Sequence, residues 1–171
     1  MLCLSAPSEV NADGPAYQHL ICDLEGNVIP IAPEEFPGPF PFAVQGRMLA
    51  WTDGPEDNTL RLVRIEEDGR VSELARQSFD GYPINGGGVS PDGKWVAFPL
   101  RPQWGNDPSR SVCLWETEAG TVVLLDDPTP RERTDPAAIW VRWNGAYPEV
   151  DFNISDAPNS NGHNELWQYV F

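Results

Sequence analysis

The chain has 171 residues, of which 11 are basic and 26 acidic, and its formal net charge is −15. This length suits one domain with its own core, and a hydrophobic content of 40% argues against global disorder. Such a charge repels a phosphate backbone, and no apolar run reaches the roughly 20 residues of a membrane helix, so neither nucleic-acid binding nor membrane insertion is expected.

The first residues, 1–6, are briefly apolar, but no basic segment precedes them and acidic residues follow soon after. This pattern does not predict a secretory signal. The three cysteines, Cys3, Cys22 and Cys113, are widely spaced and form no Cys-x-x-Cys pair. We therefore expect small buried apolar residues rather than a disulfide framework or a zinc site.

Short apolar runs separated by proline and glycine dominate the rest of the chain, and helical periodicity is weak. Three kinds of segment recur in the same order. A turn precedes a strand at residues 44–51, 89–98 and 141–152. A strand that ends in an acidic glycine turn follows at 19–26, 60–69 and 111–120, and 165–171 resembles its start. A further short strand comes at 28–31, 71–75 and 121–125.

The turn residues explain this spacing. Gly26, Gly69 and Gly120 supply the positive φ that a tight hairpin needs. Residues 90–93, Ser-Pro-Asp-Gly, suit a type I turn in which Asp92 bonds nearby backbone. Residues 86–88, three consecutive glycines, are expected to let the backbone pass close to a neighbouring element. These residues are predicted to be structural.

One turn and four strands make a meander of about 45 residues, the size of one blade of a β-propeller. The sequence thus predicts an all-β fold, a single domain over 1–171, with about four blades. Each would be a four-stranded antiparallel meander, and the first and last blades are incomplete. Their approximate ranges are 1–32, 40–76, 84–126 and 138–171.

Residues 89–98, Val-Ser-Pro-Asp-Gly-Lys-Trp-Val-Ala-Phe, resemble the Ser-Pro-Asp-Gly-Lys signature of TolB-like (WD40-like) β-propeller repeats. The resemblance is sharp over 84–126 and loose elsewhere. It implies a propeller scaffold. Three arrangements remain open: a piece of a longer propeller, a compact ring, and a ring completed by another copy. Because an open arc exposes blade faces and strand edges, a protein partner or self-association is expected.

Large aromatic residues in the predicted strands are expected to pack between blades. They are Trp51, Trp95, Phe98, Trp115, Trp140, Trp143, Phe152 and Trp167. Trp104 differs, because it lies with Arg101, Asn106 and Asp107 in a segment predicted to be a loop. These four residues form a candidate binding loop.

No catalytic motif is present. There is no Gly-x-Ser-x-Gly, no phosphate-binding glycine loop with lysine and no His-Glu-x-x-His. Residues 53–58 and 151–165 are rich in oxygen ligands, but their spacing does not match an EF-hand, and solvated turns are expected. The sequence therefore predicts no enzyme, no catalytic residue, no metal and no cofactor. It favours a non-catalytic scaffold for protein–protein interaction, with the accessory part of a hydrolase or lyase as the alternative.

Overall fold

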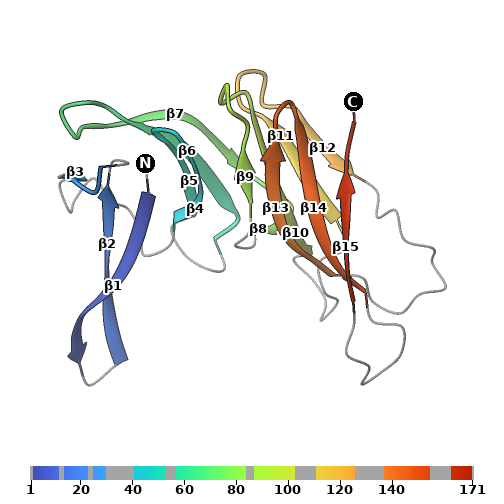
Figure 1. The fold of residues 1–171 in the computed structure, drawn as a ribbon. Helices are drawn as coiled ribbons and strands as arrows, with labels where there is room; N and C mark the ends of the chain where they lie inside the picture. Colours follow the sequence, from blue (N-terminus) through green and yellow to red (C-terminus); the bar gives the residue numbers. More distant parts are fainter. Residues whose placement is uncertain are drawn as a thin grey trace.

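The computed structural model describes residues 2–11, 14–22, 25–29, 41–52, 57–83, 87–102, 111–125, 137–154 and 163–170. In several strands only the backbone is described. All the elements found in these ranges are β-strands, which confirms the predicted all-β fold. No helix in the described ranges is long and apolar enough to cross a membrane. The strands form four antiparallel sheets of three to five strands, which succeed one another in chain order (Figure 1).

The first sheet contains β1 (Leu2–Asn11), β2 (Gly14–Cys22) and β3 (Val28–Ile29). β1 and β2 form a long hairpin whose register slips once, between Pro7 and Glu9. The second sheet contains β4 (Pro41–Gln45), β5 (Met48–Thr52), β6 (Thr59–Ile65) and β7 (Val71–Ser78), in that order.

The third sheet contains β8 (Gly81–Pro83), β9 (Gly88–Val89), β10 (Trp95–Pro102), β11 (Ser111–Glu116) and β12 (Val122–Leu125). β9 and β8 pair with opposite ends of β10, so together they act as one interrupted strand. The repeat pattern does not predict β8. The fourth sheet contains β13 (Ala137–Asn144), β14 (Tyr147–Ile154) and β15 (His163–Gln168).

The predicted turn chemistry is confirmed where the structure describes it. Gly26, Gly69 and Gly120 have φ of 89°, 85° and 67°. In the turn before β10, the amide of Gly93 donates to the carbonyl of Ser90 at 2.9 Å. The Asp92 carboxylate accepts from the Ser90 hydroxyl at 2.7 Å and from the Lys94 amide at 3.1 Å. Asp92 is therefore a turn-forming residue, as its sequence context predicts.

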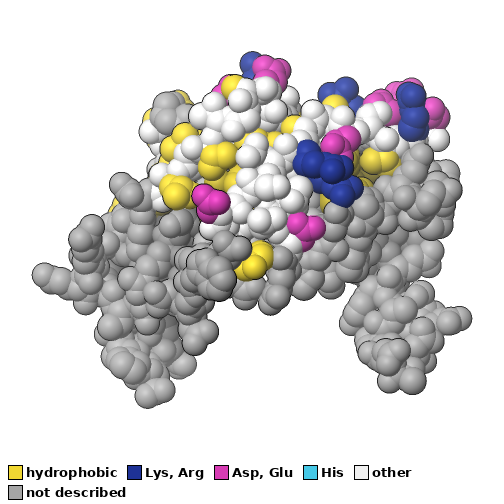
Figure 2. Space-filling view, turned by 180° about the vertical axis from the view of Figure 1, so that it is seen from behind, with side chains coloured by type: hydrophobic (Ala, Val, Ile, Leu, Met, Phe, Trp, Pro, Cys, Tyr) yellow, Lys and Arg dark blue, Asp and Glu magenta, His cyan; other side chains and the backbone are white. Residues whose placement is uncertain are grey.

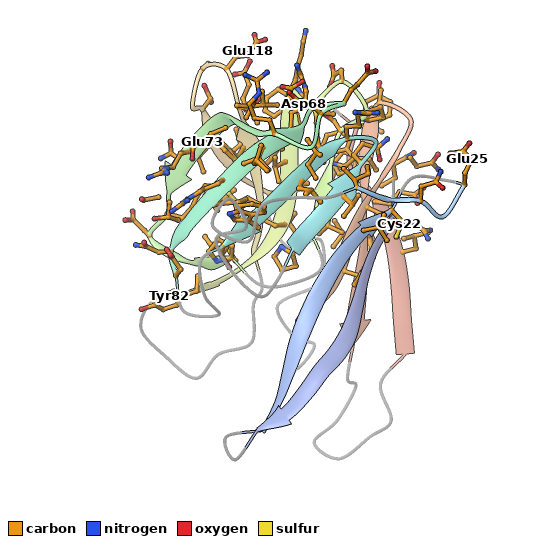
Figure 3. All side chains as sticks on the ribbon, turned by 90° about the vertical axis from the view of Figure 1, so that its left-hand side faces the viewer. Cys22, Glu25, Asp68, Glu73, Tyr82 and Glu118 are labelled. Atoms are coloured by element: carbon orange, nitrogen blue, oxygen red, sulfur yellow. The ribbon has the colours of Figure 1, made fainter. Side chains whose placement is uncertain are left out.

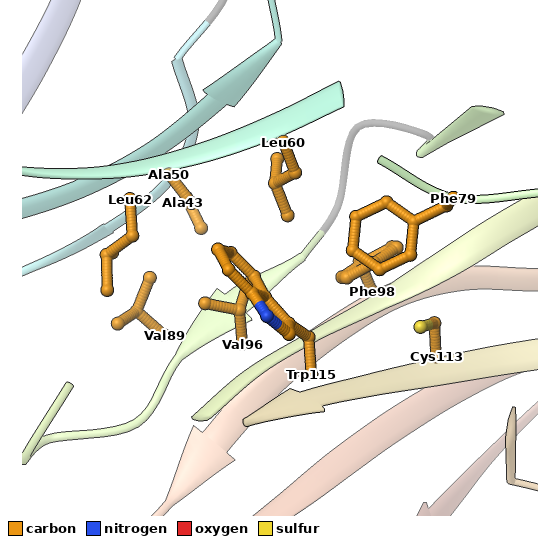
Figure 4. Packing of buried hydrophobic residues seen from close by; sticks show 10 residues of the cluster. All are labelled: Ala43, Ala50, Leu60, Leu62, Phe79, Val89, Val96, Phe98, Cys113 and Trp115. Atoms are coloured by element: carbon orange, nitrogen blue, oxygen red, sulfur yellow. The ribbon is translucent and has the colours of Figure 1, made fainter. Parts of the chain in front are cut away.

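Three hydrophobic clusters lie along the series of sheets. One joins the second and third sheets through Leu60, Leu62, Phe98 and Trp115, among others (Figure 4). A second joins the third and fourth sheets, and a third packs the opposite face of the second sheet against Ile29 of β3. The inner strands of the second and third sheets are therefore buried on both faces, which explains why β5, β10 and β11 are largely apolar runs rather than strict alternations.

The first strands of successive sheets lie beside one another. β4 contacts β9, β9 contacts β13, and β1 contacts β4. Figure 1 shows the β1–β2 hairpin and the fourth sheet on opposite sides of the molecule, with the second and third sheets between them. The close approach predicted for the glycine run occurs at Gly88, whose carbonyl accepts from the Trp143 indole at 2.9 Å.

The expected packing of aromatic residues between sheets holds for some residues and not for others. Trp51, Phe98 and Trp115 are buried in the clusters, and Trp95 and Trp143 pack against them. Phe79, which the sequence does not single out, meets Phe98 and Trp115 edge to face, with ring centroids 5.0 Å and 6.1 Å apart. Trp140 and Trp167 are exposed instead, and the side chain of Phe152 lies outside the described residues.

Candidate protein-binding surface

Among the described residues, most of the exposed large apolar side chains lie at two places, the outer face of the fourth sheet and the outer edge of the third. On the fourth sheet, Trp140 of β13 pairs with Asp151 of β14, which pairs with Leu166 of β15. Side chains of directly paired residues share a face of a sheet. Trp140 and Leu166 therefore lie in one row, and they are 54% and 51% exposed. We call this row and its face the end face.

The opposite face of the same sheet is buried at Val141 and Val150, whereas Trp167, which pairs with Val150 on that face, is 38% exposed. Val141 and Val150 pair with each other and pack against the third sheet. The end face is the counterpart of faces that the second and third sheets bury against their neighbours. Complete burial of a large apolar side chain stabilises by about 1.5–3 kcal/mol, and these two half-exposed side chains gain only part of this energy. The end face therefore differs from an ordinary solvated sheet.

A hydrogen-bonded ion pair lies beside this row. Glu149 accepts from the Arg142 guanidinium at 2.9 Å and from the Asn144 amide at 2.7 Å, and only 8% of the residue is exposed. Hydrogen bonds from Asn144 and then Arg142 lower the pKa of Glu149 below its ordinary value of 4.5. The carboxylate is thus charged and satisfied, and it fixes the hairpin between β13 and β14.

The second place is β12, the last strand of the third sheet. It pairs with β11 on one side, and no described strand pairs with its other side. Its first three residues, Val122, Val123 and Leu124, are 39%, 41% and 58% exposed. Figure 2 shows hydrophobic side chains on the side of the third sheet, and basic and acidic side chains on the side of the second sheet.

The outermost strand of the second sheet, β7, has a different character. Its exposed side chains include Glu73 and Arg76, which form an ion pair with an N–O distance of 2.8 Å. Figure 3 shows Glu73 on the outer side of β7. Charged side chains on an edge strand discourage pairing with another chain, whereas an apolar edge invites it. β7 is therefore a protected edge, and β12 is not.

The turns between the last two strands of the second and third sheets carry acidic side chains. Asp68 and Glu118 lie at the same end of the molecule in Figure 3. Glu116, at the end of β11, stands beside the turn that leads into β12, and Lys94 contacts this turn through the backbone of Thr117. The approach to β12 from this end is therefore predominantly acidic, in line with the net charge of −15.

The predicted binding loop lies mostly outside the described residues. Trp104, Asn106 and Asp107 fall in the range 103–110, which the structure does not describe. Arg101 belongs to β10, where its backbone pairs with Tyr82 of β8. The strand thus extends into the segment that the sequence assigned to a loop, because β8 provides a pairing partner there. The prediction of a binding loop stays a prediction.

The candidate metal ligands and the cysteines of the described ranges make structural contacts or are buried. No group of three or more His, Cys, Asp or Glu side chains in these ranges could hold a metal ion. Of the two oxygen-rich segments, residues 53–56 and 155–162 lie outside the described part. Asp57 accepts from the Thr59 amide at 2.7 Å, which is a turn contact. Cys22 and Cys113 are buried free thiols, as predicted, and burial raises the pKa of Cys113 to about 12.

Comparison with known protein families and with curated proteins returns no match for this chain.

Proposed function

We propose that the chain is a non-catalytic scaffold of the β-propeller type, related to TolB-like repeats, that binds protein through its exposed sheet surfaces. Four antiparallel meanders in series support this proposal, as does the contact between the first strands of successive sheets. In a propeller the first strand of each blade lines the axis, so this contact is what neighbouring blades would produce. On this proposal the chain forms an arc of about four blades.

The end face is the observation that carries the functional part. Trp140 and Leu166 occupy a sheet face whose counterparts in the two middle sheets are covered by the next sheet. Large aromatic side chains that remain exposed beside polar ones are typical anchors of protein interfaces. We propose that a sheet of another protein molecule covers this face, and that a second copy of the chain can do so.

No described feature specifically favours the alternative, an accessory part of a hydrolase or lyase. That alternative rests on analogy between folds, and analogy of fold does not establish function. A rigid scaffold with exposed loops and edges is sufficient for binding, and it requires no cofactor.

Multi-angle light scattering of the purified chain at micromolar concentration tests the proposal. We expect dimers or larger species, and an increase of their fraction with salt, because salt screens the repulsion between chains of charge −15. The double variant Trp140→Ser, Leu166→Ser should shift the mass toward the monomer. Leu74→Ser, an exposed apolar residue of β7, is the matched control and should leave the mass unchanged.

A wild-type chain that stays monomeric at micromolar concentration, at low and at high salt, would contradict the assignment of the end face to self-association. Equal loss of mass in the Leu74→Ser control would also count against it, since the effect would then not be specific to this face.

A further inference from the structure

The outer edge of β12, with which no described strand pairs, offers backbone groups in a defined pattern. In the hairpin between β11 and β12, the amide of Glu116 donates to the carbonyl of Thr121 at 2.8 Å. Hydrogen-bonded and non-hydrogen-bonded pairs alternate along an antiparallel ladder. The next pair, Trp115 with Val122, is therefore non-hydrogen-bonded, and so is Cys113 with Leu124. The N–H and C=O groups of Val122 and Leu124 point away from β11, toward the free edge.

The side chains on both sides of this edge are apolar. Val122 and Leu124 pair with Trp115 and Cys113, whose side chains belong to the cluster shared with the second sheet. Val123 projects to the other side of the sheet, toward the fourth. Residues 122–125 contain no polar side chain. A strand that binds at this edge thus meets the main-chain donors and acceptors of Val122 and Leu124, and apolar side chains on both faces of the sheet.

Only an extended polypeptide presents donors and acceptors at the spacing of a strand, about 3.3 Å per residue along the edge. Addition of a strand to a free sheet edge is a recognised mode of peptide binding, in which main-chain bonds supply affinity and alternate side chains supply specificity. The ion pair of β7 makes that edge unsuitable, which leaves β12 as the outermost strand with an apolar edge in the two middle sheets.

The charge beside β12 indicates whether a second copy or a different protein occupies this edge. The turn that leads into β12 carries Glu116 and Glu118 against Lys94, so the entry to this edge repels a further acidic chain and attracts a basic segment. A partner with basic residues on either side of an apolar stretch has the complementary charge. The occupant that fits is therefore an extended, basic segment of another protein.

We propose that β12 is a docking edge for an extended segment of a partner protein, with alternating apolar residues and basic flanks, which adds to the third sheet as a further strand. This proposal rests on the scaffold function above and names one of its binding sites. The end face is a separate surface on the fourth sheet, so the two sites are tested independently.

The probe is a fluorescein-labelled peptide in which valine alternates with threonine and two lysines stand at each end. Its binding to the full chain is followed by fluorescence anisotropy. We expect saturable binding, and at least about tenfold weaker binding when glutamates replace the lysines, a difference of about 1.4 kcal/mol. We expect a similar loss when the valines of the peptide carry N-methyl groups, because N-methylation removes main-chain donors and leaves the protein unchanged.

Variants of the chain locate the site. Leu124→Pro removes an outward N–H and fills the edge with the proline ring, while the bonds between β11 and β12 remain. We expect it to abolish binding. Leu124→Thr keeps the N–H and should retain most of the affinity. Circular dichroism checks that Leu124→Pro is folded; should it fail to fold, the N-methylated peptide still decides the matter.

Equal binding of the methylated and unmethylated peptides would overturn the proposal, as would unchanged binding to a folded Leu124→Pro variant. Absence of peptide binding by a chain that self-associates through the end face would refute the docking edge and leave the scaffold function standing. Dissociation of wild-type oligomers by Leu124→Pro would instead show that a second copy covers β12, and would contradict the partner proposed here.

Discussion

Replacement of Gly88 by alanine tests the contact between β9 and β13, on which the series of sheets depends. A Cβ atom at this position would lie 2.9 Å from Cδ1 of Trp143, 3.1 Å from Cα of Arg142 and 3.2 Å from the carbonyl oxygen of Val141. Ordinary van der Waals contact begins at 3.4 Å. Two of these three neighbours are backbone atoms of β13, so rotation of a side chain cannot relieve the overlap.

The expected cost follows from two opposing effects. Overpacking of a well-filled site typically destabilises by about 1–3 kcal/mol. Replacement of glycine restricts the unfolded chain and returns about 0.4–1 kcal/mol. Since the backbone of β13 must shift, we expect a net loss of about 1–2 kcal/mol. For a chain of this length, each kcal/mol lowers the midpoint of thermal unfolding by about 2–4 °C, so the midpoint should fall by about 2–8 °C.

Thermal and urea unfolding followed by circular dichroism measure this loss, and a double-mutant cycle assigns its cause. Trp143→Ala removes the nearest neighbour, so the cost of Gly88→Ala should be smaller in its presence, by more than about 0.5 kcal/mol. Gly46→Ala is the matched control. Its Cβ would meet nothing within 4 Å, but its φ of 58° strains an L-residue, and its cost should simply add to that of Trp143→Ala. A Gly88→Ala variant as stable as the wild type, or strict additivity with Trp143→Ala, would refute the reasoning.

Three further outcomes are expected. Ser90→Ala should cost about 1–3 kcal/mol in urea unfolding, because the Trp95 amide loses the hydroxyl acceptor that it now has at 2.9 Å, whereas Ser90→Thr should retain most of the stability. Hydrogen bonds lower the pKa of Asp92 from 3.8 and that of Glu149 from 4.5, so both carboxylates stabilise the fold above these pH values. This stabilisation is lost as the pH falls through the lower pKa of the folded chain. In urea unfolding from pH 6 to pH 2, the stability of Glu149→Gln should therefore fall less than that of the wild type. Cys113, buried with a pKa of about 12, should react with a thiol reagent far more slowly in the native chain than in urea, and equal rates would contradict its burial.

The local structure of this chain was largely predictable because glycine, proline and aspartate impose backbone geometry through their own covalent structure. The turn at Ser90–Gly93 and the positive φ of Gly69 are examples. β8 was not predicted, because its own residues do not impose an extended backbone. Three residues, Gly-Tyr-Pro, have no strand pattern of their own, and they are extended because the far end of β10 offers them a partner.

The candidate surface was harder to foresee. The run Val-Val-Leu-Leu of β12 is the pattern of a strand buried on both faces, yet three of these residues are exposed, because position at the edge of a sheet depends on tertiary neighbours. The exposure of Trp140 also depends on tertiary neighbours. Its sequence context matches that of the buried tryptophans, and only the absence of a described fifth sheet beyond β13 distinguishes it.

The burial of both faces of the inner strands in the second and third sheets has a consequence for how the molecule opens. The second and third sheets each pack against two neighbouring sheets, whereas the first and fourth sheets each pack against one among those described. Amide hydrogens in β6, β10 and β11 should thus exchange with deuterium most slowly, and those of the first and fourth sheets should exchange first. Local unfolding should therefore begin at the two outer sheets and reach the two middle sheets last.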